Sequence, residues 1–195
     1  SELRFIKINN VLNLFIMKRP FEILFLLFMI LFTNCNSNNE EMRKVIFLHH
    51  STGQAVWYGG VNRYVRKLTN RSDVKVFFNT YNRTHDTKYV ITETSFPKEA
   101  PYGWKNYPYD YYNIWVKNAG VNPYLDEPTL EILTKEYDII IFKHCYPVSN
   151  IKEDLGAPNI ESEEKRLENY KLHYDALKKQ MHEFPETKLI VWSPV

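Results

Sequence analysis

The chain has 195 residues, of which 44% are hydrophobic and 15% aromatic, enough for one hydrophobic core but hardly for two. Its formal net charge of +2, without a block of Lys and Arg, argues against nucleic acid as a partner. Because there are only two cysteines, a disulfide-rich scaffold is excluded.

The first part of the chain differs in composition from the rest. Residues 1–16 precede Met17, the expected start of translation, and we exclude them from the fold. Residues 17–34 have a basic start and a short apolar stretch that ends just before Cys35, which is typical of a lipoprotein signal peptide. The apolar stretch is too short for a comfortable membrane span, although a buried helix or an anchor helix remains an alternative.

The polar residues 35–42 follow at once, as a tether would, and we expect the folded domain to comprise residues 43–195. Cleavage before Cys35 would make this residue the site of lipid attachment and leave Cys145 as a free thiol. The sequence therefore predicts an exported protein that a lipid on Cys35 anchors to a bacterial membrane.

Hydrophobic patterns predict a series of strands and helices in the remaining chain. In chain order they are a strand over 43–49, a helix over 61–68, a strand over 73–78, an irregular stretch over 79–128 with a short helix over 110–118, a helix over 129–136, a strand over 137–143, a helix over 162–184 and a strand over 188–192. This alternation predicts an α/β fold, with three α/β/α layers around a parallel sheet of flavodoxin-like type.

The helix over 162–184 has an apolar stripe at steps of three and four residues, and Ser162 is placed to cap it. The chain stops at the tip of the strand over 188–192, with no helix after it. We therefore expect the domain to be incomplete at its C-terminus, lacking its last strand or strands and a helix.

The strongest chemical signal is the run Lys44–Gly53. Its first half is almost wholly apolar, which is typical of a strand buried on both faces of a parallel sheet. The run ends in His49, His50, Ser51, Thr52 and Gly53, and ligands of such sheets bind at the carboxyl ends of the strands. Gly53 allows a tight turn toward the next helix, so Ser51 is placed as the nucleophile of a hydrolytic enzyme.

Four blocks of the sequence resemble the SGNH/GDSL hydrolase superfamily. They are Phe47-Leu48-His49-His50-Ser51-Thr52, the segment 73–79, the segment 138–143 and the segment 188–194. The resemblance implies a serine esterase-type hydrolase that needs no cofactor, with Ser51 as its catalytic residue. His50 stands where the family usually has aspartate.

The sequence departs from this family at the turns that hold the oxyanion. Residues 79–84 lack the family's glycine, and residues 144–150 lack a clear Gly-x-Asn-Asp block. Candidates for oxyanion or pocket contacts are therefore His50, Gly53, Asn82, His144, Ser149 and Asn150. The family's Asp-x-x-His pair, which supplies the general base, is not visible, and we expect it beyond Val195.

Other chemistry is less well supported by the sequence. A resident histidine can serve as the base, and His144 is a better candidate than His49 or His50, but pocket lining is the simpler interpretation. A zinc site from these three and Cys145 has no recognised ligand spacing, so we assign no metal.

The aromatic segment 102–115 has two interpretations. Its rings can stack on sugars, or they can pack an insertion onto the sheet, and we favour packing. The expected partner is a small-molecule or glycan ester. The rival function is a non-catalytic surface lipoprotein that binds a glycan or another partner through this segment.

Overall fold

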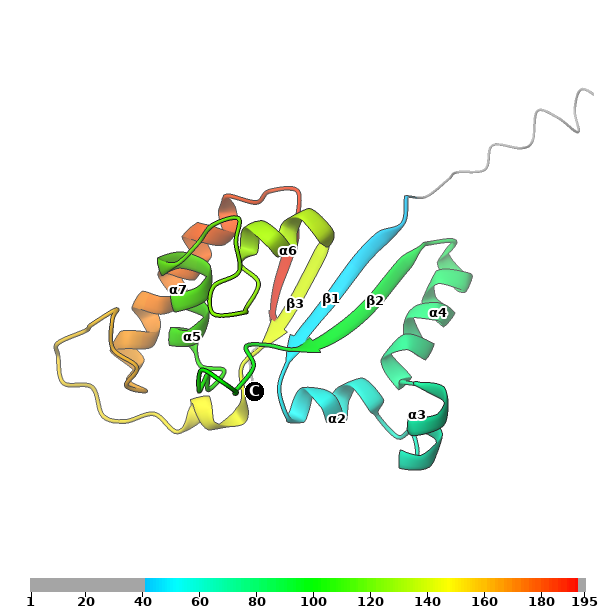
Figure 1. Cartoon of the computed structure of the whole chain (residues 1–195), viewed down its shortest axis with the longest axis horizontal. Helices are drawn as coiled ribbons and strands as arrows, with labels where there is room; N and C mark the ends of the chain where they lie inside the picture. Colours follow the sequence, from blue (N-terminus) through cyan, green and yellow to red (C-terminus); the bar gives the residue numbers. More distant parts are fainter. Residues whose placement is uncertain (1–40, 193–195) are drawn as a thin grey trace, which may run out of the picture. The chain divides into compact units, whose positions relative to one another are not determined.

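The computed structural model describes residues 41–192, and at its centre is a four-stranded parallel sheet. The strands are β1 (Arg43–His49), β2 (Tyr89–Ser95), β3 (Ile139–Lys143) and β4 (Lys188–Trp192), in the order β2-β1-β3-β4 (Figure 1). This order is that of the flavodoxin-like sheets, whose ligands bind where the strand order reverses, beside β1. The predicted α/β fold is confirmed.

Helices cover both faces of the sheet. They are α2 (Thr52–Tyr58), α3 (Arg63–Thr69), α4 (Asp73–His85), α5 (Pro108–Tyr112), the π-helical turn η1 (Asn113–Lys117), α6 (Leu130–Glu136), the 3₁₀ turn η2 (Tyr146–Ser149) and α7 (Leu167–His182). In Figure 1, α2 and α4 lie on one side of the sheet, and α5, α6 and α7 lie on the other.

Two hydrophobic clusters produce the three layers. Successive side chains of a strand point to opposite faces, so β1 contributes to both clusters. Val45 and Phe47 pack with Trp57 of α2 on one face. On the other face, the buried cluster contains Ile46, Leu48, Phe96, Trp104, Tyr111, Ile114, Trp115, Leu130, Leu133, Ile140, Phe142 and Leu177. The chain from 41 to 192 is therefore a helix–sheet–helix sandwich.

The prediction of a strand over 73–78 was wrong, because this segment belongs to α4. Its large side chains, Val74, Phe77, Phe78 and Tyr81, recur at the spacing of one helical face. Ser72 caps the helix by accepting a hydrogen bond from the Lys75 backbone N–H at 3.0 Å. The second strand is instead β2, within the stretch that we predicted to be irregular.

The other predicted elements are present, with shifted ends. The helix predicted over 162–184 begins at Leu167, and Ser162 does not cap it. The Ser162 hydroxyl accepts from the Glu164 backbone N–H in the preceding turn, and the backbone of Lys152 pairs with that of Arg166. Backbone pairing thus holds the chain extended up to the start of α7.

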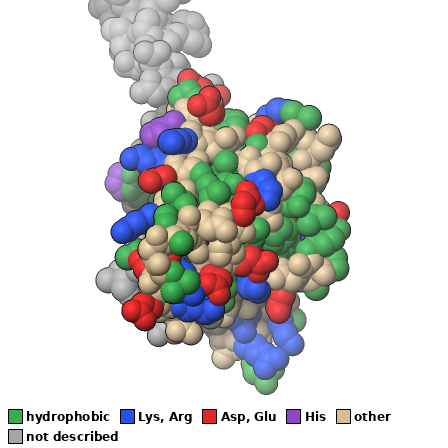
Figure 2. Space-filling model, turned by 90° about the vertical axis from the view of Figure 1, so that its left-hand side faces the viewer, with side chains coloured by type: hydrophobic (Ala, Val, Ile, Leu, Met, Phe, Trp, Pro, Cys, Tyr) green, Lys and Arg blue, Asp and Glu red, His purple; other side chains and the backbone are tan. Residues whose placement is uncertain are grey.

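The packing interpretation of the aromatic segment 102–115 is confirmed for its largest side chains. Trp104, Tyr111, Tyr112 and Trp115 are buried, and the Trp115 ring lies 5.1 Å from that of Phe142 on β3. On the face that Figure 2 shows, acidic and basic side chains are interspersed rather than separated.

The predicted signal peptide and the lipid-attachment residue Cys35 lie outside the described residues. Between residues 41 and 192, none of the helices has the length and apolar character that crossing a membrane requires.

Candidate functional site

Ser51 lies at the sharp turn between β1 and α2. Its backbone has φ 37° and ψ −96°, which lies outside the regions that side chains other than glycine readily adopt. A turn of this kind carries a side chain away from the strand end, and Ser51 is exposed to solvent. Strained backbone at a strand-to-helix turn is typical of nucleophilic serines in α/β hydrolases.

Gly53 is needed because His49 packs directly beneath it. A Cβ atom on Gly53 would lie 2.3 Å from the Cβ of His49, a distance that atoms cannot adopt without a shift. Gly53 is buried, and the turn relies on its small size rather than on a left-handed conformation. The sequence proposed Gly53 for the freedom of its backbone in a tight turn, whereas the structure requires it for its small size.

His49 is held by a neighbouring strand. Its Nε2 lies 2.9 Å from a carboxylate oxygen of Glu93 on β2. Burial lowers the pKa of His49, and the Glu93 carboxylate opposes this effect. His49 is buried under α2, which favours a packing role over a catalytic one.

His50 turns toward the segment that follows β2. Its Nε2 donates a hydrogen bond to the Pro97 carbonyl, which can only accept, so this nitrogen carries the proton. The half-buried ring of His50 therefore helps to fix the turn that contains Ser51.

His144 lies on the opposite face of the sheet from His49. It is almost fully buried, and its ring contacts those of Tyr111, Phe142 and Tyr174. Burial lowers the pKa of His144 to about 3, so the imidazole is neutral at physiological pH. Its surroundings indicate a part of the aromatic core rather than a base for Ser51.

The other candidates after β3 occupy the same edge of the sheet as Ser51. Ser149 ends the η2 turn and Asn150 follows it, and both are exposed. Cys145 is half-buried, and its backbone N–H donates to the carbonyl of Asn106 at 3.3 Å.

Asn82 does not lie near Ser51. It belongs to α4, where its amide donates to the Tyr89 carbonyl at 2.8 Å and accepts from the Tyr89 N–H at 2.9 Å. Tyr89 begins β2, opposite Arg43 at the start of β1. Asn82 therefore lies at the other edge of the sheet, and the strand-end position assumed for it was wrong because the strand itself was wrong.

Sequence reasoning missed Lys143 and the role of Thr52. Lys143 ends β3, and its Nζ donates to the Thr52 hydroxyl at 2.6 Å and to the His144 carbonyl at 3.0 Å. Only 8% of Lys143 is exposed, and this burial lowers its pKa. The sequence offered one hint, a lysine that directly continues an apolar strand. This hint was weak, because lysine side chains are usually exposed to solvent.

Asn106 is a second buried residue that the sequence did not single out. Its amide group donates to the Phe96 carbonyl at 2.6 Å and to the Tyr111 hydroxyl at 3.0 Å. Since an amide has two N–H donors, both are used within the protein, and Asn106 supports the loop after β2.

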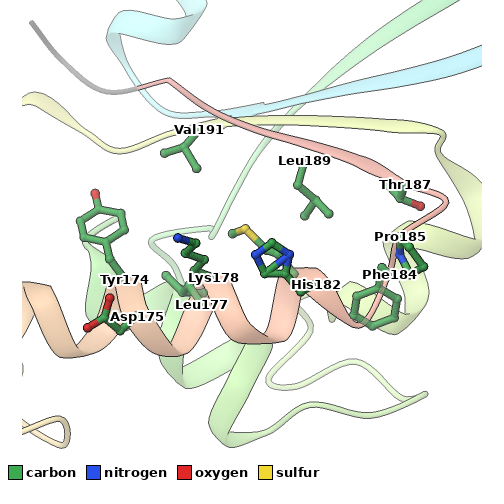
Figure 3. A pocket seen from close by; sticks show the side chains of 11 residues that line it. Tyr174, Asp175, Leu177, Lys178, His182, Phe184, Pro185, Thr187, Leu189 and Val191 are labelled. Carbon is green, nitrogen blue, oxygen red and sulfur yellow. The ribbon is translucent and has the colours of Figure 1, made fainter.

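A groove of about 550 Å³ lies elsewhere. It runs between α7 and β4, with the apolar side chains of Leu177, Leu189 and Val191 inside it and Lys178 and His182 beside them (Figure 3). None of the candidate residues at the end of β1 lines this groove.

The described residues thus bring Ser51, Thr52 and Lys143 to one edge of the sheet, with the His49–Glu93 pair behind them. Between residues 41 and 192, no three His, Cys, Asp or Glu side chains lie close enough to hold a metal ion together. No protein-family model, no curated protein and no solved structure matches the chain.

Proposed function

We propose that this domain is a serine esterase-type hydrolase of SGNH/GDSL-like character, with Ser51 as its nucleophile. The observation that carries the proposal is the backbone conformation of Ser51, at φ 37° and ψ −96°. Such strain costs about 1–3 kcal/mol and persists where the surrounding structure imposes it, most often at functional sites. Here β1, the His50–Pro97 hydrogen bond and the His49–Gly53 contact impose it.

The reaction would proceed in two steps. The Ser51 hydroxyl oxygen attacks the ester carbonyl carbon while a general base accepts its proton, and the carbonyl electron pair moves onto oxygen. Collapse of this intermediate expels the alcohol, which takes up the proton, and leaves an acyl group on Ser51. Water then attacks the acyl-enzyme and releases the acid. An acylated extracellular glycan is the substrate that suits the proposed export of the protein.

The rival binding function loses its main support. It required the aromatic segment 102–115 to present rings to a ligand, but the two tryptophans of this segment are buried, and Tyr102 is its exposed aromatic side chain. We therefore favour the enzyme.

A fluorophosphonate probe tests the proposal on the full chain. We expect covalent labelling that peptide mapping assigns to Ser51 and that Ser51→Ala abolishes. Ser162→Ala is the matched control, since this half-buried serine lies outside the site and its removal should leave labelling unchanged. A folded wild-type protein that the probe does not label at Ser51 would contradict the proposal.

A further inference from the structure

Lys143 is a buried lysine without a carboxylate partner among the described residues. Within the described part of the chain, no carboxylate oxygen lies within ion-pair distance of its Nζ, whereas the exposed Lys105, Lys117 and Lys152 each have a glutamate partner. Among the described residues, its Nζ donates to two neutral oxygens, those of the Thr52 hydroxyl and the His144 carbonyl. A buried charge is costly unless it is paired, so this arrangement is suited to an anion that arrives from outside.

The ammonium group lies beside the Ser51 turn. In the pairing of β1 with β3, Leu48 is opposite Phe142, so Lys143 is level with His49 at the end of the sheet. Its oxygen partner Thr52 directly follows Ser51 in the chain. A protonated lysine has three N–H donors, and the two neutral oxygens leave the third for a further acceptor.

Among the titratable groups that face Lys143, the Cys145 thiol opposes the lowering of the Lys143 pKa that burial causes. These groups are His49 from β1, together with His144 and Cys145 from the segment that it begins. Burial lowers the pKa of both histidines, which keeps them neutral. Glu93 is engaged with His49 on the side of β2.

Several of the more familiar donors are already used or lie too far away. Asn82 is at the opposite edge of the sheet, and both amide hydrogens of Asn106 are donated within the protein. The backbone N–H groups of Gly53 and Gln54 donate to the carbonyls of His50 and Ser51. The backbone N–H of Ser51 and the side chains of Ser149 and Asn150 stay candidate donors at this edge, and a fixed cation is a stronger donor than any of them.

We propose that the Lys143 ammonium binds the oxyanion that forms when Ser51 attacks an ester, in place of the glycine and asparagine donors that the sequence lacks. This inference rests on the proposed function. Lys143 donates a hydrogen bond without transferring its proton, and the new charge on oxygen neutralises the buried cation. Thr52 positions Nζ and takes no part in bond making.

Methylphosphonate, a tetrahedral anion that resembles this intermediate, is the probe, and titration calorimetry measures its affinity for the full chain. We expect Lys143→Met, which keeps the length but removes the charge, to weaken binding at least tenfold. Lys105→Met removes an exposed lysine and should leave the affinity unchanged. Thr52→Val removes only the positioning contact and should change the affinity less than threefold.

These variants distinguish a Lys143 that binds an anion from a Lys143 that only holds Thr52 in place. If Lys143 only held Thr52 in place, Lys143→Met and Thr52→Val would have equal effects, and that result would overturn the proposal. Should Lys143→Met not fold, a ¹³C-lysine NMR titration of the wild type replaces it, with the Lys143 signal identified by its loss in Lys143→Arg. We expect this signal to shift most on adding methylphosphonate, and an unmoved signal refutes the site.

The fluorophosphonate experiment distinguishes the two proposals. If Ser51 is labelled at the same rate in the wild type and in folded Lys143→Met, the hydrolase stands and the oxyanion role of Lys143 fails. If Ser51 is never labelled but methylphosphonate binding still requires Lys143, the esterase proposal fails and the site is an anion-binding one. We expect labelling in the wild type, slowed about 10²–10³-fold in Lys143→Met, the usual effect of removing an oxyanion donor.

Discussion

Because Gly53 lies so close to His49, we expect the single methyl group added by Gly53→Ala to destabilise the protein. In Gly53→Ala, the added carbon would lie 2.3 Å from Cβ, 2.4 Å from Cγ and 2.7 Å from Nδ1 of His49. These atoms belong to a buried residue on the central strand and have little room to move. Overpacking of this kind costs about 1–3 kcal/mol, and here we expect the upper part of that range.

The helical position of Gly53 offsets part of this cost. Alanine is favoured over glycine inside a helix by about 0.5–1 kcal/mol. The net loss in the free energy of unfolding should therefore be about 1–2 kcal/mol. Urea denaturation followed by circular dichroism measures this difference.

Gly60→Ala is the matched control. A Cβ atom on Gly60 would meet its nearest neighbour, a carboxylate oxygen of Asp73, at 3.8 Å, which is ordinary contact. We expect this variant to be as stable as the wild type or slightly more stable. If Gly53→Ala were as stable as Gly60→Ala, the close approach of His49 to α2 would be refuted.

Two further predictions concern residues that the sequence proposed for the site. Asn82→Ala removes the side chain that joins α4 to the start of β2, which should cost about 1–3 kcal/mol in a urea titration. Fluorophosphonate labelling of Ser51 should persist in the folded variant, and its loss would contradict the placement of Asn82 at the far edge. His144 has a folded-state pKa of about 3, below the ordinary 6.5, so the unfolded chain binds the extra proton and stability falls as the pH drops from 6.5 toward 3. His144→Phe should lower the pH dependence of the free energy of unfolding in this range by up to about 1.4 kcal/mol per pH unit. Urea titrations at several pH values measure this dependence, and an equal dependence in both proteins would contradict the prediction. The lowered pKa values of His49 and His173 act in the same direction, so part of the dependence remains.

The fold was predictable where burial alone determines the structure. β1 is a buried apolar run, and β3 and β4 are apolar runs that each follow a helix, and such runs have few alternatives in an α/β chain. The segment 73–78 was ambiguous, because a dense set of Val and Phe fits a strand locally, and the helical spacing appears only when Tyr81 is included. β2 was missed because it is an edge strand whose second half, Thr92–Ser95, is wholly polar and resembles a loop.

The candidate site was predictable only in part. The position of Ser51 follows from the end of β1, since that end was recognised. Lys143 could not be identified, because its burial depends on α2 covering the end of β3, a tertiary contact that no local pattern records. The error at Asn82 came from the strand predicted over 73–78, which is part of α4. Asn82 therefore lies at the edge of the sheet opposite to the one where we predicted it.

The two layers of helices each contain a buried tryptophan, Trp57 on the side of α2 and Trp115 on the side of α7. The indole of Trp115 donates to the Pro128 carbonyl at 3.1 Å, and the Lys75 ammonium lies 5.7 Å from the centre of the Trp57 ring. Their surroundings differ, so their fluorescence should report separately on the two sides of the sheet. Replacing Trp104 and Trp192 together with either one by Phe would leave the other as the sole reporter of its layer and show whether both layers unfold in the same step.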